Sequence, residues 1–519
     1  MIGRRGFLKS VGAALGFVSL ESCVQTRRRE PLASLVPATP SLAPNYWCTW
    51  AVQNYTHGQG EREFDVSQLE GAPGAEFARN SLNERVLLGS QGWAKSFYPR
   101  VRNELFLLLD DGWEEGGTAT FQLDREKFSS LKGTAQDRLR GLNESVSSHG
   151  WRGTALWCRN PPGGDADRDY VSWVKFAGIP YLKVDRGDDS GNLARERARQ
   201  SASIVLEHIH LDGCLNGNWQ EEGRFGPQPW GSPRQQILLN TDVYRTYDAT
   251  AILGVATTLD RAAGLLQGAS GHPEARALLN VEDEVYIAAV LGCSMGVMRH
   301  PLRGLRPGPD VDVFFPPPRN LKQRMDEVVR AIRWQRIAPP YSAGIGTVTL
   351  DTVSLTDEWA FKRGETFEAK VINKRVRQGA PSRLARNMVL PEVRSEGELP
   401  YVACTRFPGG AVAVGAFERV SIEKQVFQPR SHVYCEVGDT SGPVGIFGQY
   451  GSLTLVFGKG FRSGRILAQD LAGDVPVDVT DLVKKRGSTI VIPGSLIDQV
   501  GRSAGTPNDL SMPGLVLSI

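Results

Sequence analysis

The feature that most constrains the fold is a repeated alternation of short apolar runs with amphipathic helical stretches from Tyr46 to about residue 338. Runs such as ELFLLLD at 104–110 are continuously apolar up to a final acid, which is typical of strands buried on both faces, and stretches such as 130–148 have helical periodicity. Strands joined by helical crossovers pair in parallel. Eight such units would take about 37 residues each, which fits a TIM barrel. We therefore predict an α/β fold with a (β/α)8 barrel over 46–343.

The pattern changes after residue 344. Segments such as VTLDTVSL, AVAVGAF and GSLTLVFG are short and rich in β-branched residues, and Gly, Pro and Asp separate them. This composition is typical of antiparallel sheets joined by tight turns. We predict a C-terminal antiparallel β-sandwich over 344–519.

Composition excludes several classes of protein. The 519 residues are 41% hydrophobic and 23% charged, and the mean hydropathy is −0.26. These values exclude a disordered chain, a polytopic membrane protein and a disulfide-stapled miniprotein. The formal net charge of +3 gives no bulk electrostatic reason to bind nucleic acid.

The N-terminus resembles a bacterial export signal. Arg4, Arg5 and Lys9 precede an apolar stretch of ten residues over 11–20, which is too short to span a bilayer. The arginine pair resembles the twin-arginine pattern, with an ordinary secretory signal as the alternative. Leu-Glu-Ser-Cys, ending at Cys23, resembles a lipobox.

We therefore expect an export signal over 1–23, with Cys23 lipidated or, as the alternative, simple cleavage and release. Residues 24–45 are rich in Arg and Pro and have no amphipathic period, so we predict a flexible tether. The expected location is the periplasm or cell envelope of a bacterium, with membrane contact only through the lipid anchor.

Three predicted strands end in acidic residues, at Asp110-Asp111, at Asp185 and at Asp248. Asp111 and Asp185 lie 74 positions apart, and Asp185 and Asp248 lie 63 apart. Each gap corresponds to about two β–α units, so the motifs should lie on strands two, four and six. All would then point into the C-terminal mouth of the barrel, where enzymes of this fold keep their active sites.

Facing carboxylates in such a mouth suit glycoside hydrolysis, because one attacks the anomeric carbon while the other protonates the leaving oxygen. Lys183 shares a strand face with Asp185, since side chains alternate along a strand. A cation there keeps a nucleophilic carboxylate ionised or binds a sugar hydroxyl. Arg245 can act in the same way near Asp248.

The motifs D-D-x-W, L-K-x-D and an arginine followed by an aspartate occur in the order that α-galactosidases have. At motif level, most of residues 46–519 resemble the α-galactosidase (melibiase-like) enzymes of glycoside hydrolase family twenty-seven and its clan relatives. The resemblance implies a nucleophile, an acid/base and residues that bind galactose hydroxyls. It implies that Asp185 is the nucleophile and that Asp248 is the acid/base, with Arg245 as the arginine that precedes it. Asp110, Asp111 and Lys183 would bind the galactose hydroxyls.

The third motif departs from the family pattern. The family places its acid four residues after the arginine, whereas Asp248 follows Arg245 by three, and Asp242 is the fallback. Glu207 or His208, at the end of the fifth strand, occupies the region that reads the C2 substituent in relatives.

Aromatic side chains near the motifs have two interpretations each. Trp113 either forms a platform that stacks on a sugar or belongs to the core. Trp47, in the first strand, either lines the pocket or is core.

The sequence therefore predicts a retaining glycosidase that cleaves terminal α-galactoside-type residues without a cofactor. A related sugar is an alternative: an α-N-acetylgalactosaminide, a β-L-arabinopyranoside or an α-glucan. A non-catalytic glycan-binding lipoprotein on a decayed barrel is another. His208-x-His210 lacks the carboxylate partners of a metal site. Glu282, Asp283 and Glu284 are predicted to begin a helix over 281–292, where acids favour the helix dipole.

Overall fold

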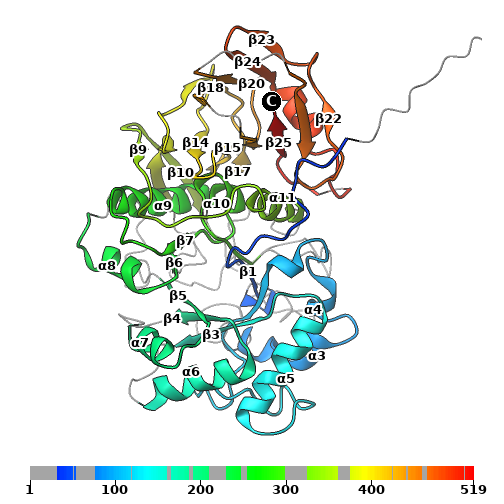
Figure 1. Cartoon of the computed structure of the whole chain (residues 1–519), viewed down its shortest axis with the longest axis vertical. Coiled ribbons are helices and arrows are strands. Elements are labelled where there is room, and N and C mark those ends of the chain that lie inside the picture. The colour runs from blue at the N-terminus through cyan, green and yellow to red at the C-terminus, as the bar shows by residue number, and fades with distance from the viewer. Residues whose placement is uncertain are drawn as a thin grey trace, which may run out of the picture. The chain divides into compact units, whose positions relative to one another are not determined.

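The computed structural model describes fifteen stretches of the chain (Figure 1). They are 32–50, 52–53, 76, 78–117, 120–159, 165–185, 191–209, 229–246, 254–298, 324–360, 375–423, 425–439, 442–458, 464–507 and 509–519. The predicted export signal, Cys23, His210 and Asp248 lie outside these stretches.

Eight parallel strands form the first sheet, in the order β7-β6-β5-β4-β3-β2-β1-β8. A parallel bridge between Asn280 and Ser294 joins β7 to the segment that leads into β8, so the sheet is nearly closed. This confirms the predicted barrel. The strands are β1 (Tyr46–Cys48), β2 (Phe106–Leu109), β3 (Thr154–Arg159), β4 (Tyr181–Asp185), β5 (Val205–Ile209), β6 (Val243–Arg245), β7 (Leu278–Asn280) and β8 (Gly296–Val297).

Helices connect these strands and follow the last of them. Helix α5 shows why such segments are helical: Thr134 and Asp137 form a capping box at its start, and Leu139, Leu142 and Val146 recur along one buried face. The others are α3 (Glu84–Leu88), α4 (Trp93–Ser96), η3 (Arg102–Glu104), α5 itself (Ala135–Ser148), α6 (Asp165–Ala177), α7 (Gly191–Arg199), α8 (Pro233–Asn240), α9 (Val255–Ala269), α10 (Val285–Leu291) and α11 (Met325–Gln335).

Side chains alternate between the outside and the inside of the barrel. Trp47 and Leu182 belong to the apolar core that surrounds the sheet. Tyr46 on β1 reaches inward, and its hydroxyl donates to Glu207 on β5 at 3.3 Å. A Cβ atom at Gly296 would lie 2.6 Å from that hydroxyl oxygen, so β8 needs a glycine there. The interior is therefore filled by side chains, as in other barrels of this kind.

The predicted helix over 281–292 is wrong in its first part. Strand β7 ends at Asn280, the helix begins only at Val285, and Asp283 has a left-handed backbone with φ of 57°. The amide nitrogen of Met298 donates to Asp283 Oδ1 at 2.9 Å, so this acid ties the turn to the end of β8. The acids thus occupy a strand-to-helix turn.

The C-terminal region is a second, sheet-rich layer, which confirms the predicted β-sandwich. Its two main sheets run β22-β21-β25-β19-β15-β14-β12-β9 and β13-β18-β20-β24-β23. They enclose a separate apolar core that includes Val414, Ile446, Leu453 and Ile490. The pairing is mixed, because β12–β14, β15–β19 and β18–β20 are parallel.

The strands of this region are β9 (Val348–Leu350), β10 (Ser354–Ala360), β11 (Arg375–Pro381), β12 (Arg383–Arg386), β13 (Glu392–Arg394), β14 (Tyr401–Arg406), β15 (Val412–Phe417), β16 (Arg419–Ser421), β17 (Gln425–Phe427), β18 (His432–Glu436), β19 (Val444–Phe447), β20 (Ser452–Val456), β21 (Leu467–Asp470), β22 (Val477–Asp478), β23 (Lys484–Arg486), β24 (Thr489–Pro493) and β25 (Gly514–Ser518). One helix, α12 (Gly494–Val500), follows β24.

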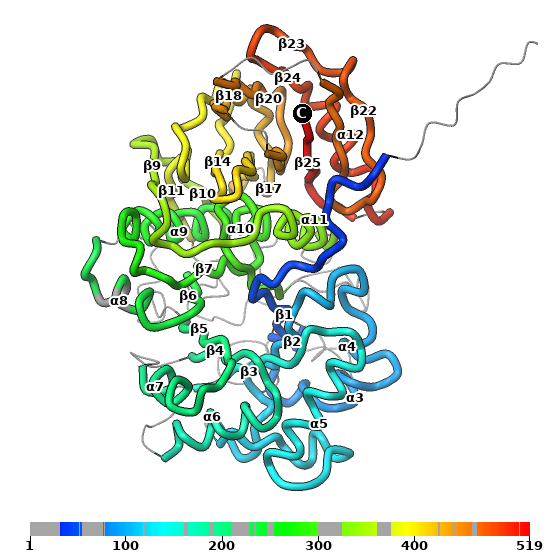
Figure 2. The backbone as a smooth tube through the Cα atoms, in the orientation of Figure 1, coloured from blue at the N-terminus to red at the C-terminus, as the bar shows by residue number. Residues whose placement is uncertain are grey.

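The last three barrel helices pack against the sandwich (Figure 2). Helix α9 contacts β11, α10 contacts β14 and β15, and α11 contacts β25. Arg330 on α11 forms a bidentate ion pair with Asp470 on β21, with N–O distances of 2.8 and 3.1 Å. The two regions therefore belong to one compact unit, which begins at Ser34.

The N-terminal strap, which we define as residues 34–45, corrects the predicted tether. The amide nitrogen of Leu35 donates to Gln469 Oε1 at 2.6 Å, and that of Ser41 donates to Glu104 Oε2 at 2.6 Å. Val36 is buried. These contacts bind the second half of the predicted tether to the folded unit, so it is not flexible.

No helix within the described stretches is long and apolar enough to cross a membrane.

Candidate active site

The first two acidic motifs, and the arginine of the third, lie on the strands that their spacing predicted. Asp110 and Asp111 directly follow β2, Asp185 is the last residue of β4, and Arg245 is the last residue of β6. These are alternate strands of one parallel barrel, so the residues gather at its C-terminal mouth. Asp248, the predicted acid/base, falls within 247–253, outside the described residues.

Asp110 and Lys183 form a buried ion pair across the barrel. Lys183 Nζ lies 2.7 Å from Asp110 Oδ2, and both side chains are almost fully buried. The Cys48 thiol also donates to Oδ2, at 3.1 Å, and Thr49 Oγ1 accepts from the Asp110 amide at 3.0 Å. Strands β1, β2 and β4 thus fix one carboxylate in one position.

The electrostatics of this cluster are consistent with an ionised Asp110. Burial raises the pKa of Asp110, but the charge and hydrogen bond of Lys183 and the bond from Cys48 outweigh it, so the pKa is lowered. Burial raises the pKa of the Cys48 thiol, with the charge of Asp110 adding to the effect. Cys48 therefore stays protonated and serves as a hydrogen-bond donor.

Asp185 lies on the same inward face of β4 as Lys183. It is 8% exposed, and Trp157 Nε1 on β3 donates to its Oδ2 at 3.2 Å. Arg159, the last residue of β3, is its register partner on the neighbouring strand. The Asp185 carboxylate therefore lies at the barrel mouth and accepts a hydrogen bond from the neutral indole of Trp157.

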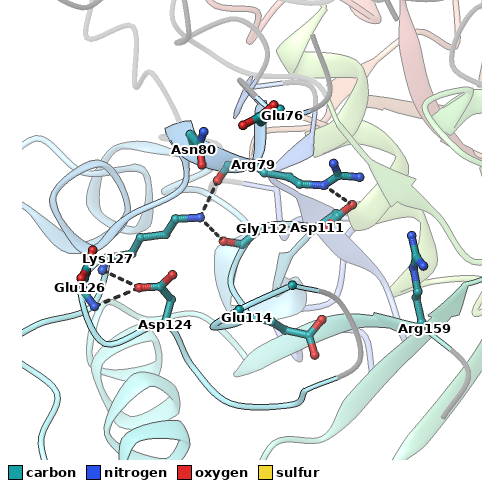
Figure 3. Close-up of a pocket in the computed structure, with 12 residues that line it drawn as sticks. Glu76, Arg79, Asn80, Asp111, Gly112, Glu114, Asp124, Glu126, Lys127 and Arg159 are labelled. Atoms are coloured by element: carbon teal, nitrogen blue, oxygen red, sulfur yellow. Dashed lines mark hydrogen bonds and ion pairs between the residues drawn. The ribbon is translucent and has the colours of Figure 1, made fainter. Parts of the chain in front are cut away.

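The side chain of Asp111 points toward Arg79 (Figure 3). Arg79 Nε lies 2.7 Å from Asp111 Oδ2. Burial raises the pKa of Asp111, and Arg79 opposes this only in part. Gly112 follows with φ of 115°, and a Cβ atom there would lie 2.6 Å from the Cα atom of Arg79. The turn after β2 therefore requires a glycine for Arg79 to approach.

Arg245 has a partner that the sequence analysis missed. Its guanidinium forms an ion pair with Glu282, and both side chains are buried. Glu282 follows β7 closely. It therefore has the same pattern as Asp110, an acid just after a barrel strand. It was missed because β7 has only three residues and Glu282 itself was assigned to the start of a helix.

Glu207, which is predicted to read a sugar substituent, faces the interior of the barrel from β5, where its register partner on β4 is Lys183. It is completely buried inside the barrel and accepts from Tyr181 Oη at 3.0 Å and Asn280 Nδ2 at 2.8 Å, besides Tyr46. Burial raises its pKa, despite the opposing charge of Arg245. His208, the other candidate, faces outward and stacks on Tyr244.

Both candidate tryptophans belong to the core. Trp113 is 0% exposed, packs edge-on against Phe121 and donates from Nε1 to the carbonyl of Trp157 at 2.9 Å. Trp47 is also 0% exposed and packs between Phe97 and the helices outside the sheet. These positions contradict a stacking platform at Trp113 and a pocket wall at Trp47.

Asp242, the fallback acid, lies at the wrong end of its strand. It precedes β6, pairs with Arg197 and accepts from the Leu206 amide at 2.8 Å. The N-terminal ends of barrel strands face away from the mouth. Asp242 therefore cannot reach a sugar bound by Asp110 and Lys183.

The described residues contain no group of three or more His, Cys, Asp or Glu side chains that could hold a metal ion. No protein-family model matches the chain, and no curated protein matches its sequence.

Proposed function

We propose that the chain is a retaining glycoside hydrolase that removes terminal α-galactoside-type residues from carbohydrates. The observation that carries this proposal is the group of Asp110, Lys183 and Asp185 on two alternate strands at one barrel mouth. All three side chains are buried, and barrel enzymes place catalytic carboxylates at this position.

In the proposed mechanism, Asp110 and Lys183 bind sugar hydroxyls and so fix the ring. An oxygen of Asp185 attacks the anomeric carbon and forms a covalent glycosyl ester as the glycosidic bond breaks. Asp248 gives its proton to the leaving oxygen. It then takes a proton from water, which attacks the anomeric carbon and releases Asp185 as a carboxylate.

The direct test is the Asp185→Asn variant with an aryl α-galactoside. We expect turnover to fall by at least about a thousand-fold, since removal of a covalent nucleophile abolishes the main pathway. Asp165→Asn, at an exposed position on α6, is the matched control and should keep wild-type turnover. Circular dichroism of both variants checks that the fold is intact.

A second measurement identifies the attacking residue. An activated fluorosugar that leaves a stable ester should label the wild-type protein, and peptide mass spectrometry should place the label on Asp185. Wild-type turnover in Asp185→Asn, or a label elsewhere, refutes the nucleophile assignment. Binding of galactosides by the wild-type protein without hydrolysis would favour the glycan-binding alternative.

A further inference from the structure

A pocket of about 550 Å³ adjoins the candidate active site on the side of Asp111 (Figure 3). All its lining residues are polar or glycine, so a ligand that fills it must present hydrogen-bonding groups over most of its surface. They are Glu76, Arg79, Asn80, Asp111, Gly112, Glu114, Gly116, Gly117, Asp124, Glu126, Lys127 and Arg159.

Two of the three basic side chains in this pocket are already engaged. Arg79 pairs with Asp111, and Lys127 Nζ donates to the carbonyl oxygens of Arg79 at 3.1 Å and Gly112 at 2.8 Å. Arg159 differs: its Nε is buried and has no hydrogen-bond partner in the described part of the chain. A buried donor without a partner is costly, so Arg159 is the side chain that a ligand would satisfy.

Arg159 also connects the pocket to the proposed chemistry. It ends β3, the strand that lies between β2 with Asp110 and β4 with Asp185. Its register partner on β4 is Asp185 itself. A molecule in the pocket would therefore lie next to a sugar held by Asp110 and Lys183.

We infer that this pocket is a subsite for a second sugar unit, so that the substrate is an oligosaccharide and Arg159 is a specificity-determining residue. This inference rests on the proposed function. Carboxylates accept from sugar hydroxyls, and a guanidinium donates to hydroxyl and ring oxygens. The lining has five acidic and three basic side chains, which disfavours an anionic sugar. The volume suits a ligand larger than one hexose.

The test is calorimetric binding to the Asp185→Asn protein, which separates recognition from turnover. The probes are galactose and an α-1,6-linked galactosyl-glucose disaccharide. We expect the disaccharide to bind at least about ten-fold tighter, and we expect Arg159→Ala in the same background to bring the ratio of the two affinities close to one. Arg125→Ala, at an exposed arginine outside the pocket lining, is the control and should leave that ratio unchanged.

Each outcome decides a separate point. Equal affinities for the two sugars in the parent protein overturn the second subsite but leave the proposed function standing. An unchanged ratio in Arg159→Ala overturns the role of that residue. Failure of both sugars to bind overturns this inference together with the proposed function. A thermal unfolding measurement on Arg159→Ala checks that the variant is folded, so that a change in the affinity ratio is not caused by unfolding.

Discussion

At the scale of single residues, the Asp110–Lys183 pair, which we propose binds the sugar, also has to be stable when it is buried without one. Removal of one partner from a buried pair leaves an uncompensated charge. Lys183→Met should therefore lower the free energy of unfolding by about 3–5 kcal/mol, measured by urea denaturation at pH 7. The loss should shrink below pH 4, where Asp110 becomes protonated in the unfolded chain and, in this variant, in the folded protein.

The double variant Asp110→Asn/Lys183→Met is the matched control, because it removes both charges at once. It should recover much of the lost stability. Equal destabilisation by the single and double variants would show that the methionine disturbs packing and that the pair contributes little. Neither variant should bind galactose if the pair holds the sugar.

Sequence reasoning identified Asp110, Lys183 and Asp185 because their spacing along the chain matches the length of a β–α unit. It left open which side of the sheet Trp47 faces and whether Glu207 or His208 points into the barrel. Barrel strands are buried on both faces, so their sequences lack the polar–apolar alternation that marks an inward face. Partners such as Glu282 are brought to Arg245 by strand pairing and cannot be identified from spacing alone.

At the scale of elements, β10 and β16 are joined by Asp357 and Arg419, whose atoms Oδ1 and Nε lie 2.5 Å apart. Burial raises the pKa of Asp357 to about 6, although Arg419 lowers it. The folded protein therefore binds this proton more tightly than the unfolded chain, in which an Asp has a pKa of about 3.9. This residue's contribution to stability should fall as the pH rises from 4 to 6 and then stay constant.

Asp357→Asn should remove that component, as measured by the difference between wild-type and variant unfolding free energies from pH 4 to 7. Asp351→Asn provides a control of opposite sign. Burial raises the pKa of Asp351, but bonds from Arg383 and Ser382 outweigh it and lower the pKa to about 2. Its contribution is present above pH 4 and is lost toward pH 2. A constant difference for Asp357→Asn across the range would contradict the prediction.

The length of an element decided how well it could be predicted. The six-residue β3 is long enough to form a clear buried run, and the fourteen-residue α5 is long enough to show helical periodicity. Strand β7 has three residues and β8 has two, so their sequences contain little pattern, and the barrel supplies their conformation by pairing. Eight-fold closure could be predicted from the longer units, whereas the exact limits of the last two strands could not.

At the scale of the whole molecule, Arg330 and Asp470 couple the barrel to the sandwich. Both side chains are 1% exposed, and Asp470 also accepts from the amides of Ala472 at 2.8 Å and Ala504 at 2.9 Å. Arg330→Met should destabilise the protein by about 3–5 kcal/mol, because it leaves Asp470 buried without its cation. We also expect calorimetry of Arg330→Met to show two unfolding transitions in place of one, since the barrel and the sandwich each have an apolar core.

Arg333→Met is the control for that prediction. Arg333 lies one turn along α11 and pairs with Asp474, whose side chain is 78% exposed. Its loss should change stability little and leave a single transition. One unchanged transition in Arg330→Met would show that the apolar contacts of α9, α10 and α11 couple the regions without the ion pair.

The N-terminal strap imposes an order on folding. Ser34 and Leu35 contact Gln469, which lies more than 430 positions later in the chain. A ribosome makes the strap among the first segments, yet the surface that receives it does not exist until β21 has been synthesised and paired. The strap therefore cannot bind β21 until almost the whole chain has been translated. Its docking requires that the N-terminal and C-terminal parts of the chain have both folded.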